Sequence, residues 1–136
     1  MLRSVARPLA LAASLSLALL ALAGPASARC RHIEVPEESR TSAYVFEGTL
    51  ESVSGTELTF LVTAVWSGSP PEHVTVGTSA RRPLASASDV GTSYLIFARG
   101  TPADLAIARC GSSAPIAQAG STIAELETLG LTRTPR

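Results

Sequence analysis

The sequence has 136 residues, 46% of them hydrophobic and 16% charged, and eleven basic residues balance eleven acidic ones to a formal net charge of zero. This length suits a single domain. The balanced charge excludes binding to nucleic acid or to an anionic membrane surface by charge alone.

Residues 1–28 have the pattern of a secretory signal peptide. Arg3 and Arg7 give a positive start, residues 9–23 form an uncharged run of Leu, Ala and Ser, and residues 26–28 (ASA) offer the small-x-small sequence that signal peptidase requires. The apolar run is shorter than the roughly 20 residues that span a bilayer. We therefore expect cleavage of the signal, a secreted or periplasmic location, and no membrane span in the exported chain.

Cys30 and Cys110 are the only cysteines. Export would place both thiols in an oxidising compartment, where an even number of cysteines predicts a disulfide. Closing this loop stabilises the fold by roughly 4–5 kcal/mol in the chain-entropy model. With both sulfurs bonded, neither is expected to act as a thiol nucleophile.

A short helical turn and a β-hairpin are the first elements expected after the signal. Residues 35–43 carry a proline and two glutamates near their start, which suit the beginning of a helix. Residues 44–53 are rich in Val, Phe, Tyr and Leu, and residues 57–66 alternate with the period of two that is typical of a strand. The Ser-Gly pair between them predicts a hairpin turn. Leu61 and Val65 indicate that the outer face of the second strand is also partly covered.

Three further strands follow the hairpin. Loop residues 67–71 lead to a third strand at residues 73–78, and the polar residues 79–91 cross over the surface. The continuous apolar run of residues 92–98 predicts a central strand, and residues 105–110 predict a fifth. Core packing is expected for the aromatic side chains on these strands, Tyr44, Phe46, Phe60, Trp66, Tyr94 and Phe97.

Beyond the fifth strand the apolar period changes to that of a helix. Residues 115–129 have helical spacing, Ser113 is placed to cap the helix, and Gly130 lies where the helix would end. We expect residues 131–136 to form a loose C-terminal tail.

Five strands and a terminal helix in about 100 residues fit either a small Greek-key barrel of the OB type or a short immunoglobulin-like sandwich. A sandwich usually has about seven strands and a disulfide between its facing sheets. Here the two cysteines would join the N-terminal segment to the end of the last strand. We therefore predict a mostly β domain over residues 29–130, a five-stranded Greek-key OB-like barrel with a C-terminal helix.

Four stretches, in order along the exported chain, match the motifs of one known family. Residues 43–50 (AYVFEGTL) look like its opening strand, and residues 60–68 (FLVTAVWSG) are similar to V-x-x-V-W-K-G with Ser in place of Lys. Residues 91–98 (GTSYLIFA) resemble its G-x-x-Y-L-V-Y-A strand, and residues 110–116 (CGSSAPI) resemble C-x-R-T-x-P-L. The chain thus resembles the netrin-type module of bacterial proteins related to tissue inhibitors of metalloproteinases, which implies an OB-like barrel.

The cysteines depart from this family's pattern. The family usually begins C-x-C and has a further cysteine in the crossover, whereas this chain has Cys30 alone at the start and none in residues 79–90. In the family, the first cysteine of C-x-C bonds the crossover cysteine, and the second bonds the cysteine before the helix. The resemblance implies that Cys30 matches the second cysteine and that Cys30–Cys110 is the surviving bridge.

The same departure bears on the inhibitory mechanism that the resemblance implies. Animal members of the family coordinate a protease's catalytic zinc through the free amine and carbonyl of the first cysteine, which its disulfide holds rigid. Here Ala28 stands at that position, at the expected cleavage point, and the new terminus, Arg29, has no bridge of its own. Loss of preorganisation weakens binding, so zinc-capping inhibition by this route is not expected.

No catalytic or metal-binding motif in the sequence is complete. His32 to Glu34 match the first half of the zinc-deaminase signature, but its P-C-x-x-C half is missing. We interpret His32 and His73 as surface residues. G-x-S-x-G, H-E-x-x-H and a glycine-rich phosphate loop are absent from the sequence. We therefore expect no enzymatic activity, no cofactor and no metal.

These patterns favour an exported, monomeric, non-catalytic binding module whose partner is another protein in the envelope or outside the cell. Loops on a rigid barrel commonly carry binding, so contacts are expected from the N-terminal segment, the loop at residues 67–71 and the crossover. The predicted contact edge comprises Arg29, Cys30, Arg31, His32, Glu34, Arg81 and Arg82. Two alternatives remain. One is a proteinaceous inhibitor of a secreted zinc metalloendopeptidase that uses the N-terminal edge or a loop rather than a chelating cysteine, and the other is a carrier of a small ligand or metal.

Overall fold

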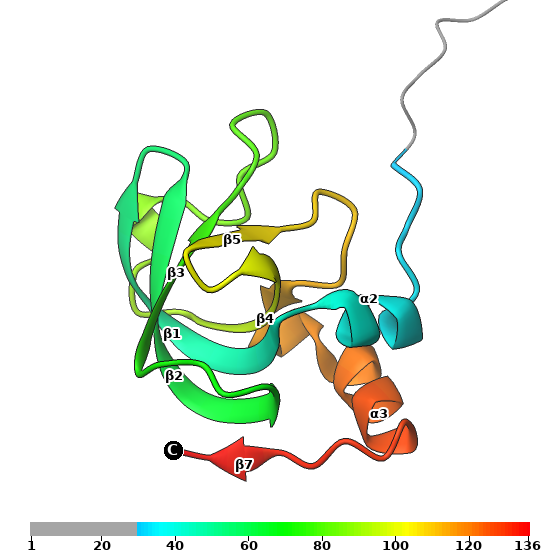
Figure 1. Ribbon diagram of the computed structural model, residues 1–136. Helices are drawn as coiled ribbons and strands as arrows, with labels where there is room; N and C mark the ends of the chain where they lie inside the picture. Colours follow the sequence, from blue (N-terminus) through cyan, green and yellow to red (C-terminus); the bar gives the residue numbers. More distant parts are fainter. Residues whose placement is uncertain (1–29) are drawn as a thin grey trace, which may run out of the picture.

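The computed structural model describes residues 30–136 (Figure 1). The predicted signal peptide, residues 1–28, and Arg29 lie outside the described residues. The barrel strands are β1 (Tyr44–Ser54), β2 (Glu57–Ser67), β3 (His73–Gly77), β4 (Ser93–Thr101) and β5 (Asp104–Ile107). The other elements are helix α2 (Val35–Thr41), the 3-10 turns η1 (Ala87–Asp89) and η2 (Ile116–Gln118), helix α3 (Gly120–Thr128), and the short strands β6 (Ala114–Pro115) and β7 (Thr134–Pro135).

Five strands close into a barrel in the order β1-β2-β3-β5-β4, and β4 pairs back onto β1. These pairings are antiparallel except for β3 and β5, which meet in parallel where Gly77 pairs with Ala106. The structure confirms the mostly β, five-stranded OB-like barrel with a C-terminal helix. The immunoglobulin-like sandwich is excluded, because one closed sheet replaces two facing ones.

Strand β1 closes the barrel because it pairs with β2 along one edge and with β4 along the other. Three irregularities in the β1–β2 register bend it, the middle one at Glu47/Gly48. The strands approach closely at this bend, since a Cβ on Gly48 would lie 3.0 Å from both the Leu61 carbonyl oxygen and the Phe60 Cβ. Strand β2 has the predicted alternation, with every second residue buried.

Apolar side chains form two cores, and β4 separates them. Inside the barrel, Phe60 packs edge-to-face against Phe46 and Tyr94, with ring centroids 6.2 and 5.7 Å apart. The second core lies between the barrel and helices α2 and α3, which pack beside each other (Figure 1). It contains Val35, Val45, Trp66, Leu95, Phe97, Ala119 and Leu126. Both faces of β4 are therefore covered, which explains its continuous apolar run.

The region after β5 differs from the prediction. The fifth strand ends at Ile107 rather than at residue 110, and the helix expected over residues 115–129 begins only at Gly120. The residues before it pair with β4 as β6 and then form η2. The proline in β6 suits a sheet edge because it has no N–H to donate. Ser113 does not cap the helix, since its hydroxyl accepts a hydrogen bond from the Phe97 N–H at 2.9 Å.

The prediction of a loose tail is wrong, because residues 131–136 are fastened to the barrel. Strand β7 pairs with β2. The Arg133 side chain donates to the Glu47 carboxylate through Nε at 2.6 Å and through Nη2 at 3.3 Å. Trp66 Nε1 donates to the same carboxylate at 2.9 Å. Glu47 is buried, and its carboxylate is stabilised by these hydrogen bonds from Trp66 on β2 and from Arg133 in the C-terminal segment.

Within residues 30–136, none of the helices combines the length and the apolar character needed to cross a bilayer.

Candidate binding edge

A disulfide fixes the N-terminal segment to the barrel. Cys30 bonds Cys110 across a sequence separation of 80, with their Cα atoms 5.5 Å apart. The Ile33 N–H donates to the Cys110 carbonyl oxygen at 3.1 Å. The predicted bridge is therefore confirmed, and it is consistent with an oxidising, exported location.

Helix α2 is tied to the same loop by a buried carboxylate. Glu38 is 3% exposed, and its Oε2 accepts a hydrogen bond from the Ser112 backbone N–H at 2.7 Å. Gly111 makes room for this carboxylate, because a Cβ on Gly111 would overlap it. Burial raises the pKa of Glu38, against the hydrogen bond from Ser112 and the nearby charges of His32 and Arg99. The N-terminal segment is thus held at two points, one covalent and one polar.

Three segments distant in sequence meet at this end of the molecule. They are the N-terminal segment, the crossover between β3 and β4, and the loop between β5 and β6. A shallow hollow of about 200 Å³ is lined by residues of all three: Cys30, His32, Arg82, Arg109, Cys110 and Gly111. We call these six residues the basic edge.

The structure brings together only part of the predicted contact residues. Cys30, His32 and Arg82 lie in the basic edge. Arg31 and Glu34 line a neighbouring hollow of about 400 Å³, which His32 also borders and to which α2 and β4 contribute. Arg81 is exposed next to Arg82 in the crossover but lines neither hollow. Arg29 lies outside the described residues.

The loop at residues 67–71, also expected to make contacts, lies elsewhere. Ser67, Gly68 and Ser69 line a shallow hollow with residues of the C-terminal segment, and Pro71 lines another with β3 and the β4–β5 turn. Neither hollow includes a residue of the basic edge. The expected contacts therefore fall on separate surfaces.

Arg109 is a member of the edge that the sequence analysis missed. It precedes Cys110, and the disulfide sets it beside Cys30 and His32. The signal was available, because residues that flank two bonded cysteines must lie near one another. Arg99, which borders the neighbouring hollow, was also missed, because the predicted strand ended at residue 98, whereas β4 continues to Thr101.

Positive charge at this end is not neutralised by ion pairs. Among residues 30–136, the side-chain ion pairs are His73–Glu51 and Arg133–Glu47. Arg82 and Arg109 are exposed and have no carboxylate of the described chain at ion-pair distance. Their guanidinium groups are free to meet a negative group of another molecule.

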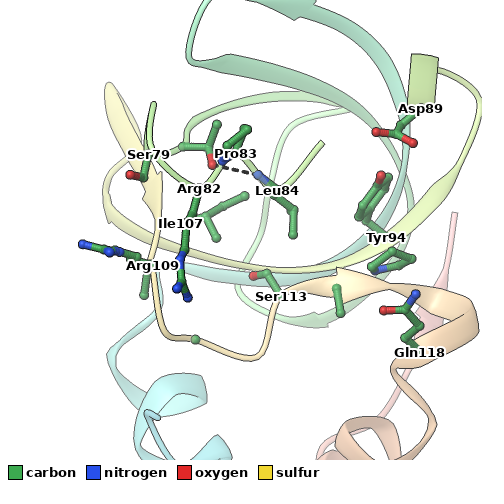
Figure 2. Close-up of a pocket in the computed structure, with 15 residues that line it drawn as sticks. Ser79, Arg82, Pro83, Leu84, Asp89, Tyr94, Ile107, Arg109, Ser113 and Gln118 are labelled. Atoms are coloured by element: carbon green, nitrogen blue, oxygen red, sulfur yellow. Dashed lines mark hydrogen bonds between the residues drawn. The ribbon is translucent and has the colours of Figure 1, made fainter. Parts of the chain in front are cut away.

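A second, more enclosed pocket of about 450 Å³, which we call the deep pocket, shares Arg82, Arg109 and Gly111 with the basic edge (Figure 2). The crossover forms one wall, where the Leu84 N–H donates to Thr78 Oγ1 at 3.1 Å. Arg82 and Arg109 lie toward one end, and Tyr94 and Gln118 lie toward the other. The pocket therefore combines two cations with a set of uncharged polar groups.

Nothing in the described part of the chain gathers three or more His, Cys, Asp or Glu side chains at metal-binding distance. His32 lies on the basic edge, while His73 lies on β3, where its Nδ1 is 2.8 Å from Glu51 Oε2. The two histidines therefore occupy different surfaces and do not form one site.

The geometry defines an OB-type barrel with a rigid, basic edge beside its disulfide. Comparison with protein-family models and with curated protein sequences finds no match for this chain. The resemblance to the netrin-type module stays a prediction.

Proposed function

We propose that this protein is an exported, non-catalytic binding module that holds a partner protein in the envelope or outside the cell. The observation that carries the proposal is the pair Arg82 and Arg109, two unneutralised cations from different loops that line one hollow. The Cys30–Cys110 bridge limits movement of the edge, which lowers the entropy lost on binding. The charge of the edge favours a partner with an acidic face.

Charge reversal of the edge tests the proposal. The tagged, exported chain serves as bait for proteins of the envelope fraction and the culture medium. We expect the double variant Arg82→Glu/Arg109→Glu to lose a partner that the unaltered chain captures. The matched control Arg40→Glu/Arg136→Glu makes the same change of charge at exposed positions outside the basic edge and the deep pocket, and should retain that partner. Equal capture by both folded variants would contradict the proposal.

A second candidate is a proteinaceous inhibitor of a secreted zinc metalloendopeptidase. The resemblance to the netrin-type module supports it, as does a disulfide-bonded cysteine close to the expected N-terminus. Chelation of zinc by that cysteine requires a free α-amine on Cys30, so the position of signal cleavage tests the chelating mechanism. Inhibition through the N-terminal edge or a loop does not depend on that position.

The intact mass and N-terminal fragmentation of the exported protein measure that position directly. A chain that starts at Arg29 leaves Cys30 without a free amine and counts against the chelating mechanism. A chain that starts at Cys30 favours the inhibitor, and titration against secreted zinc endopeptidases should then show stoichiometric inhibition. Partner capture without any loss of the partner's activity supports the binding module instead.

A further inference from the structure

We propose that the deep pocket receives an acidic side chain from the partner protein, with the carboxylate between Arg82 and Arg109. The inference rests on the proposed binding function and specifies the chemistry that the partner must present. A glutamate, with an apolar stem and a terminal carboxylate, is the side chain that suits the pocket best.

The first observation is the placement of the two arginines. Arg82 comes from the β3–β4 crossover and Arg109 from the loop after β5, yet both line this pocket and lie on the same side of it (Figure 2). Neither forms an ion pair with a described residue. Planar guanidinium groups bind carboxylates through paired, charge-assisted hydrogen bonds.

The second observation is a hydroxyl group without a partner. Tyr94 is 2% exposed, and its ring packs against Phe60 inside the barrel. Its hydroxyl lies on the side of Asp89 (Figure 2). It is not one of the fully buried polar atoms without a partner, so it is accessible from the pocket. The group is therefore available to a ligand.

The Tyr94 hydroxyl and the two arginines all carry protons, so the pocket favours a ligand that accepts hydrogen bonds. Burial and the negative charge of Asp89 raise the pKa of Tyr94, so its hydroxyl keeps its proton and can donate. Asp89 is the acidic group that lines the pocket, and its Oδ2 accepts from the Ser86 N–H at 2.8 Å and from the Ser86 hydroxyl at 3.1 Å. Arg82, Arg109 and the Tyr94 hydroxyl can therefore all donate to a bound acceptor.

The remaining walls suit a methylene stem rather than a bare anion. Leu84, Ile107 and Pro115 also line the pocket. Apolar surface of this kind is buried favourably by the stem of a glutamate and not by an inorganic ion. Residues 30–136 contain eight arginines, no lysine and eleven acidic residues, and this excess of negative charge disfavours nucleic acid as a source of the anion. An acidic protein segment is the occupant that meets all of these conditions.

Binding of a blocked tetraglutamate peptide to the full exported chain tests the inference. Calorimetry gives the affinity, and amide NMR shifts locate the site. We expect saturable binding, with affinity about tenfold weaker for blocked tetraglutamine and about tenfold weaker for Arg82→Gln or Arg109→Gln. The control Arg136→Gln removes an exposed arginine outside the pocket and should bind the peptide unchanged.

Tyr94→Phe examines the hydroxyl separately. Tyr94 lies at the opposite end of the pocket from the arginines, so its hydroxyl would donate to a second acceptor of the bound segment. The substitution removes a polar group that has no partner in the described chain, so the variant should stay as stable as the unaltered chain and still bind the peptide several-fold more weakly. Unchanged affinity for this variant, or for both arginine variants, would overturn the inference. Equal affinities for tetraglutamate and sodium sulfate would overturn it too, since the pocket would then be a simple anion site.

These results are separable from a failure of the proposed function. Suppose that tetraglutamate does not bind but partner capture is still lost in Arg82→Glu/Arg109→Glu. The proposed protein-binding function is then supported, and the proposal that the pocket receives an acidic side chain is refuted. If no partner is captured through the edge but tetraglutamate binds with the expected dependence on Tyr94, the pocket is supported as a site for an acidic side chain. The protein-binding function is then refuted.

Discussion

The carboxylate of Glu38 accepts a hydrogen bond from the backbone N–H of Ser112 at 2.7 Å, and this contact joins α2 to the loop that holds the disulfide. Its second oxygen, Oε1, is buried and has no partner among the described residues, and neither has the Ser112 hydroxyl. A charged carboxylate is poorly accommodated there. The contact is therefore a source of pH-dependent stability.

We expect the free energy of unfolding to contain a contribution from Glu38 that falls as pH rises. Burial raises the pKa of Glu38 above the ordinary value of 4.5, so above pH 4.5 the folded protein retains a proton that the unfolded chain has released. The contribution is complete below pH 4.5 and is lost as pH rises through the folded pKa. Glu38→Gln should remove this fall, as measured by chemical denaturation between pH 4.5 and pH 7.

The difference between the two pH profiles isolates the contribution of Glu38. Glu37→Gln provides the control, because Glu37 lies on the same helix but is exposed. Parallel profiles for Glu38→Gln and the unaltered protein would show that the carboxylate does not set this pH dependence.

Removal of the disulfide should weaken the fold strongly. The Cys30–Cys110 bridge closes a loop with a sequence separation of 80. In the chain-entropy model, such a bridge stabilises the folded state by about 4–5 kcal/mol. The double variant Cys30→Ser/Cys110→Ser should lose about this much in chemical denaturation. The reduced form of the unaltered protein should be similarly destabilised, and a variant as stable as the oxidised protein would contradict the prediction.

The fold could be predicted from sequence where the burial of a side chain follows from the pattern of its neighbours along the strand. The alternation along β2 and the apolar run of β4 depend on which faces of a strand are buried, so both were visible. β6 and β7 have two residues each, too few to show a period. The hydrogen bond between Arg133 and Glu47 joins residues 86 positions apart in the sequence, and no local sequence pattern predicts it.

The site was predicted less well than the fold, for a related reason. Tyr94 was correctly expected to pack in the core, but periodicity gives the face of a strand and not the surroundings of a hydroxyl at the end of a ring. Arg82 was expected at the edge because of its loop, whereas Arg109 joins it through a disulfide and a change of chain direction. The predicted disulfide could have placed Arg109 beside Cys30, but the contact of this loop with the crossover is set by tertiary structure.

Loss of the Arg133 side chain should loosen the C-terminal segment. Glu47 is buried, and Arg133→Gln would remove its charged partner while leaving the bond from Trp66. Because Arg133 is itself about half exposed, we expect a loss of only about 1–2 kcal/mol in the free energy of unfolding. Trp66 is the only tryptophan, so its fluorescence reports the change around Glu47.

The matched control for this prediction is Arg136→Gln. Arg136 belongs to the same segment, but its side chain forms no ion pair with a described residue. Its backbone N–H, which donates to the Thr63 carbonyl oxygen at 2.9 Å, is kept in the variant. Equal losses of stability in both variants would show that the Glu47 contact does not hold the tail.

Two glycines with positive φ should respond differently to alanine. Gly55 (φ +59°), in the β1–β2 turn, has nothing within 4 Å of the place a Cβ would occupy. Gly68 (φ +78°) would place a Cβ 2.5 Å from the Ala43 carbonyl oxygen and 2.8 Å from Tyr44 Cδ1. Both alanine variants adopt an unfavourable φ, at about 1–2 kcal/mol each. Gly68→Ala must also displace backbone at the start of β1, so its midpoint in thermal unfolding should lie clearly below that of Gly55→Ala. Similar midpoints would mean that the loop after β2 can move away from β1 without loss.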